Sequence, residues 1–428
     1  MQSSLLRLPC FGAFFLLCSS LFAQPFAGNF IPHGPGGGGY TYSPSISPHD
    51  PNHIFLVCDM GGVYRSENGA QTWQLVPSSS LVSTVKGKVH FTSDPEVLYV
   101  CRRSLTNLND PLFRGELAKS TNGGLDWQAL NDPTESGVHR LEVDPNSTQR
   151  MLLNEYNRLF FSNNGGETWS MVFQPADDQM WLGGVFWDGA DILVGTNKGL
   201  LVSHDGGQNF ALEAHAGIPG GTGIMHLAGA KSGGTVRLFA IGAVATELYA
   251  WNEPLGLRDH LIGFYRMDYS LGASWTNAKG NIPFGIRIAG VDLAENNTQT
   301  VWAAGDQDGL PMVFKSINGG VTWVNTFQAI DNQNVSTGWG GDYGAFSYLW
   351  SGAALGFEVS SVDPDQVILS DGMGHITNDG GASWSATYVQ PGDQNPAGSP
   401  TAVDKFYQSS GLDVTTTHQL FWLNDQEM

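Results

Sequence analysis

The stretch RSENGAQTW, residues 65–73, decides the fold, because closely related stretches recur along the whole chain. An Asn-Gly or Asp-Gly pair supplies the positive φ angles of a tight hairpin turn, and Asn, Asp or Ser side chains can bond back to the turn amides. The closing Trp is large enough to fill the gap between one sheet and the next. The further copies are KSTNGGLDW (119–127), FSNNGGETW (161–169), VSHDGGQNF (202–210), YSLGASW (269–275), KSINGGVTW (315–323) and TNDGGASW (377–384). The fourth copy closes with Phe, and the fifth has lost its Asn/Asp-Gly pair.

Seven copies of an Asp-box-type hairpin predict an all-β, seven-bladed β-propeller with four strands in each blade. In the first blade we expect strands at 41–48, 54–58, 63–66 and 72–76, separated by polar turns. We expect the propeller to occupy residues 24–395. Residues 396–428 are then a linker, a closing strand or the start of a second propeller.

Composition agrees with short strands and tight turns, since 55 of 428 residues are glycine and only 14 % are charged. The 40 acidic residues outnumber the 20 basic ones and give a net charge of −20. Such a surface repels phosphate backbones, which argues against nucleic acid as a partner. A neutral polysaccharide meets no such repulsion.

Residues 1–23 are typical of a secretory signal peptide, with Arg7 in the basic region, an apolar run to Phe22 and a small residue at Ala23. Secretion or a periplasmic location is therefore expected, and no later segment is predicted to span a membrane. Cys58 and Cys101 remain after cleavage. A disulfide and two buried thiols are both open, and we favour the thiols.

Antiparallel strand order predicts which face carries a site. The turns between first and second strands share a face with the recurring hairpins, so the loops between second and third strands lie on the opposite face, where sites tend to occur. Those loops are expected to hold Asp59, Arg102, Arg103, Asn154, Glu155, Thr196, Asn197, Asp306, Asp308 and Asp371. We expect the long connection from 324 to 355 and the loop with Trp181 to project there too.

Aromatic rings stack on sugar rings, and carboxylates accept bonds from sugar hydroxyls. The candidate substrate-binding residues are accordingly Trp339, Tyr343, Trp350, Trp181 and Glu155. For Glu155 the favoured alternative is a solvated loop residue.

Glycoside hydrolysis needs two carboxyl groups across the scissile bond. Asp59 and, more weakly, Asp371 are the candidates, at equivalent places in the first and seventh blades. For each, the alternative is a turn residue bonding its own backbone. The histidines show no metal spacing, and Asp306 to Gly309 begins like a calcium loop but lacks the remaining ligands, which favours a solvated loop. No metal or cofactor is expected.

Residues 34–73 resemble the opening of glycoside hydrolase family 74, the xyloglucanases and related endo-β-glucanases. A Gly-rich segment before an aromatic residue, at Gly36 to Tyr40, leads to a D-x-G-G-x-Y-R pattern at Asp59 to Arg65. The resemblance implies an inverting hydrolase acting as a monomer on a β-glucan such as xyloglucan. It further implies two propellers with a cleft between them, and Asp59 as general base.

Residues 407–425 are similar to the family's link into a second propeller, where the general acid follows. The resemblance places that acid beyond Met428, so the chain is expected to be a truncated sequence or a one-propeller relative. A different class stays open: a non-catalytic propeller that binds carbohydrate or protein. A sialidase is disfavoured, because the chain lacks the Arg-Ile-Pro tripeptide.

Overall fold

The computed structural model describes residues 41–58, 62–77, 79–81, 87–103, 115–177, 179–249, 259–338, 354, 356–399 and 408–411. All of them belong to one compact unit that spans residues 32–418. The predicted signal peptide, Asp59, Trp339, Tyr343 and Trp350 lie outside the described residues.

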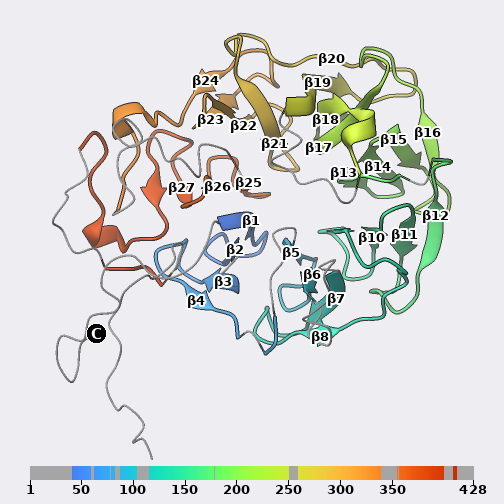
Figure 1. Ribbon diagram of the computed structural model, residues 1–428, viewed down its shortest axis with the longest axis horizontal. Helices are drawn as coiled ribbons and strands as arrows, with labels where there is room; N and C mark the ends of the chain where they lie inside the picture. Colours follow the sequence, from blue (N-terminus) through green and yellow to red (C-terminus); the bar gives the residue numbers. More distant parts are fainter. Residues whose placement is uncertain are drawn as a thin grey trace, which may run out of the picture. The chain divides into compact units, whose positions relative to one another are not determined.

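Seven four-stranded antiparallel sheets surround a common axis, as the sequence predicts (Figure 1). The first blade contains β1 (Thr41–Ile46), β2 (Ile54–Cys58), β3 (Gly62–Ser66) and β4 (Gln74–Leu75), and the second contains β5 (Val89–Phe91), β6 (Leu98–Arg103), β7 (Gly115–Ser120) and β8 (Gln128–Ala129). The third contains β9 (Arg140–Val143), β10 (Met151–Asn154), β11 (Leu159–Ser162) and β12 (Ser170–Phe173), and the fourth contains β13 (Leu182–Asp188), β14 (Asp191–Thr196), β15 (Gly199–Ser203) and β16 (Ala211–Glu213).

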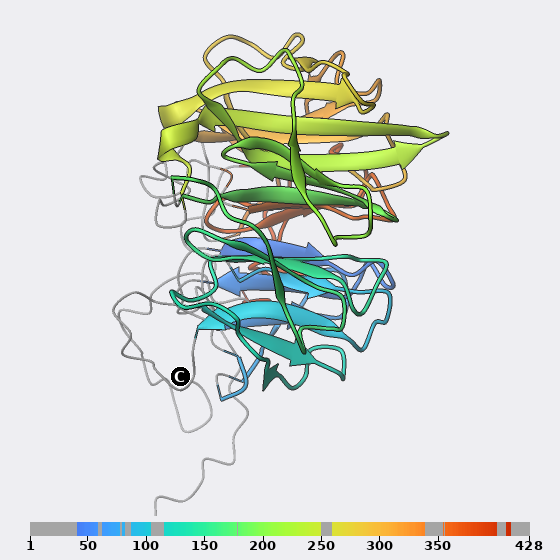
Figure 2. The same cartoon turned by 90° about the vertical axis from the view of Figure 1, so that its right-hand side faces the viewer.

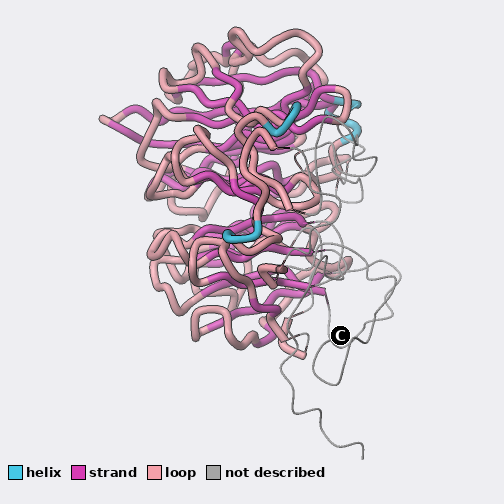
Figure 3. The backbone as a smooth tube through the Cα atoms, turned by 90° about the vertical axis from the view of Figure 1, so that its left-hand side faces the viewer, coloured by secondary structure: helices cyan, strands magenta, loops and turns pink. Residues whose placement is uncertain are grey.

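The fifth blade contains β17 (Thr222–Ser232), β18 (Thr235–Val244), β19 (Leu261–Asp268) and β20 (Thr276–Asn277), and its long strands are visible edge-on in Figure 2. The sixth contains β21 (Arg287–Asp292), β22 (Val301–Gln307), β23 (Leu310–Ser316) and β24 (Val324–Asn325), and the seventh contains β25 (Gly356–Val359), β26 (Val367–Ser370), β27 (His375–Thr377) and β28 (Ser385–Ala386). Short 3₁₀ turns at Ala245–Glu247, Ile330–Asn332 and Pro391–Asp393 are the helical elements of the described residues (Figure 3). None of these turns has the length and apolar character needed to cross a bilayer.

The recurring hairpins bond internally as their sequence predicts. In the first, Ser66 Oγ accepts the amide of Ala70 at 3.0 Å, and Asn68 Oδ1 accepts the amide of Thr72 at 2.9 Å. Equivalent amide bonds to a hydroxyl recur in five further hairpins, at Gly124, Gly166, Gly207, Gly320 and Gly381. The side chains therefore satisfy the turn amides without help from neighbouring blades.

Several of the closing tryptophans join their blade to the one before it. The indole Nε1 of Trp323 donates to Ala278 O at 2.9 Å, and that of Trp384 donates to Thr326 O at 2.8 Å. Each acceptor directly follows the outermost strand of the preceding blade. These bonds satisfy a buried donor and fix the spacing between sheets.

The outermost strands are shorter than predicted, with two residues in β4 rather than five. The amide of Trp73 donates to Ser410 O at 2.7 Å, so this residue pairs with the C-terminal segment instead of with β3. The remaining first-blade strands lie where the sequence places them, except that β1 ends at Ile46.

Buried apolar side chains fill the wedges between neighbouring blades. Ile54 and Leu56 of the first blade pack with Ile368 and Ile376 of the seventh, so the hydrophobic core continues across the junction where the ring closes. Cys58 and Cys101 are both buried, in different core clusters. Cys101 Sγ lies 3.8 Å from Val138 O.

Candidate functional site

The sequence predicts a site on the face opposite the recurring hairpins. Cys58 at the end of β2 pairs with Gly62 at the start of β3, at the end of the sheet away from the turn at Asn68. The strand ends that flank Asp59 therefore lie on the predicted face. The same topology puts Asp371, which follows β26, on this face in the neighbouring seventh blade.

The Asp371 side chain is fully buried, and its carboxylate accepts hydrogen bonds from the amides of its own turn. Its Oδ1 accepts the amides of Met373 at 3.3 Å and Gly374 at 2.9 Å, and its Oδ2 lies 3.1 Å from His375 Nδ1. The His375 ring lies edge-on to Phe327, with centroids 5.4 Å apart. This arrangement matches the alternative in which Asp371 caps its own turn, and it adds an Asp-His pair that the sequence analysis missed.

Glu155 is also buried, so the expectation of a solvated loop residue is wrong. Its Oε1 accepts Arg158 Nε at 2.7 Å, and its Oε2 accepts the amide of Glu135 at 2.9 Å. Only 2 % of the carboxylate side chain is exposed. The pair ties the β10–β11 turn to the connection that enters the third blade, which favours a structural role over contact with a substrate.

Trp181 lies between the fourth and fifth blades with 6 % of its surface exposed. Its indole Nε1 donates to Met225 O at 2.9 Å, and its amide donates to Asn197 Oδ1 at 3.1 Å. The ring packs against Ala243 and Leu248. A sugar ring has little of this indole to stack on, so the contacts favour a packing role.

Two further ion pairs, each with one member almost fully buried, link strand ends on this face. Arg102 Nε donates to Glu116 Oε1 at 3.0 Å, and Arg287 donates to Asp306 Oδ2 at 2.6 Å. Asp306 has no exposed surface, so the expectation that it lies in a solvated loop is wrong. Its partner Arg287 lies 19 residues earlier, at the start of β21, where sequence spacing gives no signal.

Ionisable residues on the innermost strands form a second polar cluster, which the sequence analysis also missed. Lys88 forms an ion pair with Glu358, whose Oε1 accepts the amide of Ile46 at 3.4 Å. Asp292 Oδ2 accepts the amide of Val359 at 2.7 Å. These bonds join blades six, seven, one and two around the axis.

The side chains of Lys88 and Arg140, at the inner edges of their blades, are 41 % and 33 % exposed, so water reaches both of them. Burial and the neighbouring Glu358 raise the pKa of Asp292 to about 7. Burial lowers the pKa of His90 to about 4 and that of His226 to about 3. Mixed charges inside the ring therefore titrate far from their ordinary ranges.

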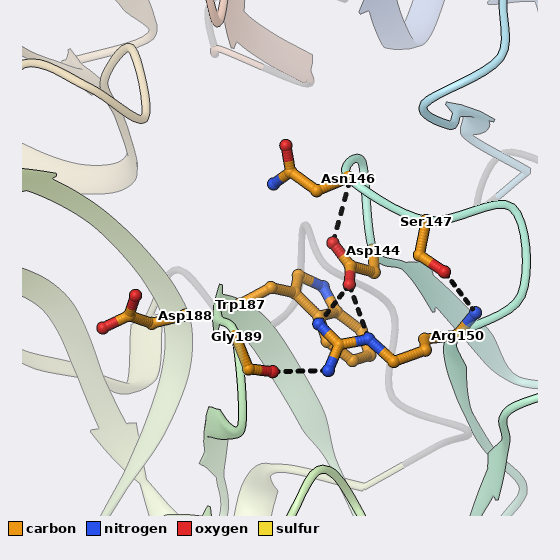
Figure 4. Close-up of a pocket in the computed structure, with 7 residues that line it drawn as sticks. All are labelled: Asp144, Asn146, Ser147, Arg150, Trp187, Asp188 and Gly189. Carbon is orange, nitrogen blue, oxygen red and sulfur yellow. Dashed lines mark hydrogen bonds and ion pairs between the residues drawn. The ribbon is translucent and has the colours of Figure 1, made fainter.

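A hollow of about 490 Å³ lies on the hairpin face, between the turns that follow β9 and β13 (Figure 4). Arg150 Nε donates to Asp144 Oδ2 at 2.7 Å, and the guanidinium lies 5.5 Å from the ring centroid of Trp187. Asp188 accepts two bonds of 2.7 Å from Lys231. The charged side chains that line the hollow are thus already paired with other side chains. The hollow lies on the face opposite the predicted site. In the part of the chain that the structure describes, no three His, Cys, Asp or Glu side chains converge as metal ligands.

Together, the sheets define the described part of the chain as a seven-bladed β-propeller. Its sequence is similar to that of a xyloglucanase from Paenibacillus sp, with 24 % identity over 330 residues that cover 68 % of this chain and 32 % of the relative. It is also similar to xyloglucanase Xgh74A of Acetivibrio thermocellus, with 27 % identity over 32 % of this chain and 18 % of that protein. No protein-family model matches the chain.

Solved structures show the same relationship at the level of the fold. The GH74 xyloglucanase of Xanthomonas campestris superimposes with a TM-score of 0.63 at 17 % identity, over 83 % of this chain and 56 % of that one. The GH74 enzyme of Niastella koreensis gives a TM-score of 0.63 at 19 % identity, over 82 % and 55 %. The resemblance to glycoside hydrolase family 74 is thus confirmed in sequence and fold. The chain spans about a third or less of the curated relatives and about half of these solved chains.

Proposed function

We propose that this propeller belongs to an exported glycoside hydrolase that cleaves a β-glucan such as xyloglucan with inversion, and that Asp59 is the general base. The observation that carries the proposal is the D-x-G-G-x-Y-R pattern at Asp59 to Arg65, in a chain similar to xyloglucanases. In an inverting reaction the base activates a water on one side of the sugar while a second carboxylic acid protonates the leaving oxygen.

The burial of other candidate carboxylates supports the assignment to Asp59. Among the candidate carboxylates on the face, Asp371, Glu155 and Asp306 are buried and bonded within the protein. The chain between Gly338 and Ala354 supplies Trp339, Tyr343 and Trp350 as candidate sugar-stacking residues. Gly338 itself is fixed by a 3.1 Å bond from its amide to the hydroxyl of Tyr388 in the seventh blade, next to the first.

Asp59→Asn tests the proposal, with Asp371→Asn as a matched control at the equivalent position of the seventh blade. Hydrolysis of xyloglucan is measured by release of reducing ends from the full-length protein. Loss of a general base is expected to slow turnover about 10²- to 10⁴-fold without changing the melting temperature. Unchanged turnover by a folded Asp59→Asn protein would refute the mechanism.

A non-catalytic carbohydrate-binding propeller is the second candidate. It is favoured by the burial of Asp371 and Glu155, which leaves neither carboxylate exposed to a substrate. A pulldown on insoluble β-glucan together with the reducing-end assay separates the two functions. Retention on the glucan without release of reducing ends supports the binding module, and release of reducing ends supports the hydrolase.

A further inference from the structure

The fifth hairpin differs from the others in what holds it. It lacks the Asn/Asp-Gly pair, and its bonds run instead to the segment that leaves the fourth blade, its neighbour in the ring (Figure 1). The amide of Trp275 donates to Ala216 O at 2.8 Å, a bond of the kind that the amides of Trp73 and Trp384 also make, so the distinguishing bonds are those of side chains. His215 Nδ1 lies 2.8 Å from Ala273 O, and Tyr269 Oη donates to Glu213 Oε2 at 3.1 Å.

Two imidazoles meet at Glu213. His204 Nε2 lies 2.9 Å from Glu213 Oε1, and His215 Nε2 lies 3.0 Å from Glu213 Oε2. The other nitrogen of each ring also faces an oxygen, since His204 Nδ1 lies 2.8 Å from Asp191 Oδ1 and His215 Nδ1 faces a backbone carbonyl.

A neutral imidazole has one N–H, whereas a carboxylate and a backbone carbonyl can only accept. Each of the two rings therefore needs both of its protons to make both of its bonds. His215 is the imidazole that links the two blades, because its Nε2 contacts Glu213 of blade four and its Nδ1 contacts Ala273 of the fifth hairpin. Its side chain is 2 % exposed, so water cannot readily replace a lost partner.

We propose that His204, His215 and Glu213 form a proton-dependent latch that fastens the fifth hairpin to the fourth blade and loosens when the imidazoles lose a proton. The latch takes the place of the side-chain cap that the other hairpins carry. It is independent of the proposed hydrolysis, since it lies at the hairpin end of blade five.

The charged surroundings set the direction of the pH dependence. Hydrogen bonds to Asp191 and Glu213 raise the pKa of His204 above its ordinary value near 6.5. Burial opposes ionisation of Glu213, but its bonds from His204, His215 and Tyr269 lower its pKa overall. Burial and Glu213 raise the pKa of Tyr269, so its hydroxyl keeps its proton and donates a hydrogen bond between pH 5.5 and pH 8.5. Asp268, beside Tyr269, bonds Arg237 at 2.6 Å instead.

For His204, a folded-state pKa above the unfolded value means that its bonds to Asp191 and Glu213 are fully formed below about pH 6.5 and are lost as pH rises through the folded-state pKa. Loosening should be local, because the other hairpins are capped by hydroxyl and amide groups or by the carboxylates of Asp205 and Asp379, whose lowered pKa values keep them charged across this pH range. The hairpin at 315–323, capped by Ser316 and Asn318, is an internal reference.

Hydrogen exchange followed by mass spectrometry tests the latch on the full chain. Between pH 5.5 and pH 8.5 the protection factor of residues 269–277 should fall about tenfold relative to residues 315–323, because a buried charged hydrogen bond is lost. Glu213→Gln should lower the protection of 269–277 at pH 5.5 to the wild-type level at pH 8.5 and remove its pH dependence.

Glu167→Gln, an exposed carboxylate in the third hairpin, should behave like the wild type. Unchanged protection of residues 315–323 shows that the Glu213→Gln chain is folded. Equal pH dependence of the two hairpins in the wild type, or a full pH-dependent loss in folded Glu213→Gln, would overturn the proposal.

Discussion

The indole nitrogen of Trp73 lies 3.0 Å from the carbonyl oxygen of Thr387 and donates a hydrogen bond to it. The two residues are 314 positions apart, yet their contact repeats the one between Trp384 and Thr326 in consecutive blades. The junction between the seventh and first blades therefore uses the same bond as the junctions between blades five and six and between blades six and seven. Ser410 strengthens it by accepting the Trp73 amide and donating its hydroxyl to Thr387 O.

Trp73→Ala should destabilise the ring by about 3–5 kcal/mol, because it removes a large side chain that is 5 % exposed and leaves a cavity between two blades. Trp73→Phe keeps most of the packing and should cost less, with about 1 kcal/mol from the lost hydrogen bond. Denaturant unfolding measures both. Trp169→Phe is the control, since Trp169 is more exposed and donates to Asn131 O at 3.2 Å. Equal losses for Trp73→Phe and Trp73→Ala would contradict this account of the closure.

Arg158→Leu should destabilise the protein by about 3–5 kcal/mol, because it leaves the Glu155 carboxylate buried without its guanidinium partner. The matched control is Lys198→Leu, which breaks a 2.6 Å pair with Asp177, a carboxylate with 58 % of its side chain exposed. An exposed pair contributes at most about 1 kcal/mol. Denaturant unfolding at neutral pH compares the two variants, and similar small losses would show that Glu155 reaches solvent or another cation.

The hairpins could be predicted from sequence because their chemistry is local. Ser66 and Asn68 lie within four residues of the amides that they accept, so their spacing alone specifies the turn. The loop residues could not be assigned in the same way. Whether Asp306 is solvated depends on Arg287, which another strand supplies, and nothing in the spacing of the two residues indicates their contact.

Trp181 illustrates the same limit for aromatic residues. A tryptophan in a polar loop before a strand is equally consistent with an exposed stacking surface and with a buried anchor. In the structure Trp181 is a buried anchor, because its indole donates to the carbonyl of Met225 in the next blade. The inner-strand ions were missed because an isolated Asp292 at the end of a strand gives no sign that Lys88 and Glu358 lie across the axis.

The last prediction concerns the pH dependence of stability and rests on Asp292. Its pKa of about 7 in the folded protein exceeds the ordinary value of 3.8, because burial and Glu358 disfavour the charged form. Between about pH 4 and pH 7 the folded state therefore holds a proton that the unfolded chain has released, and this group makes the free energy of unfolding fall as pH rises. His90 and His226 act in the opposite direction, since their lowered pKa values make stability rise between about pH 4 and pH 6.5.

The difference between wild type and Asp292→Asn isolates the carboxyl group from the histidines. The amide side chain cannot ionise, so the variant should gain stability relative to the wild type as pH rises from 4 to 8. It should start from a deficit of about 1–3 kcal/mol at pH 4, because one oxygen cannot serve both the Val359 and the Leu293 amides as the two oxygens of Asp292 do. Denaturant unfolding at intervals of half a pH unit measures the difference, and Asp94→Asn, an exposed turn residue, is the control. A constant difference across this range would mean that Asp292 ionises at its ordinary pH and that water solvates it fully.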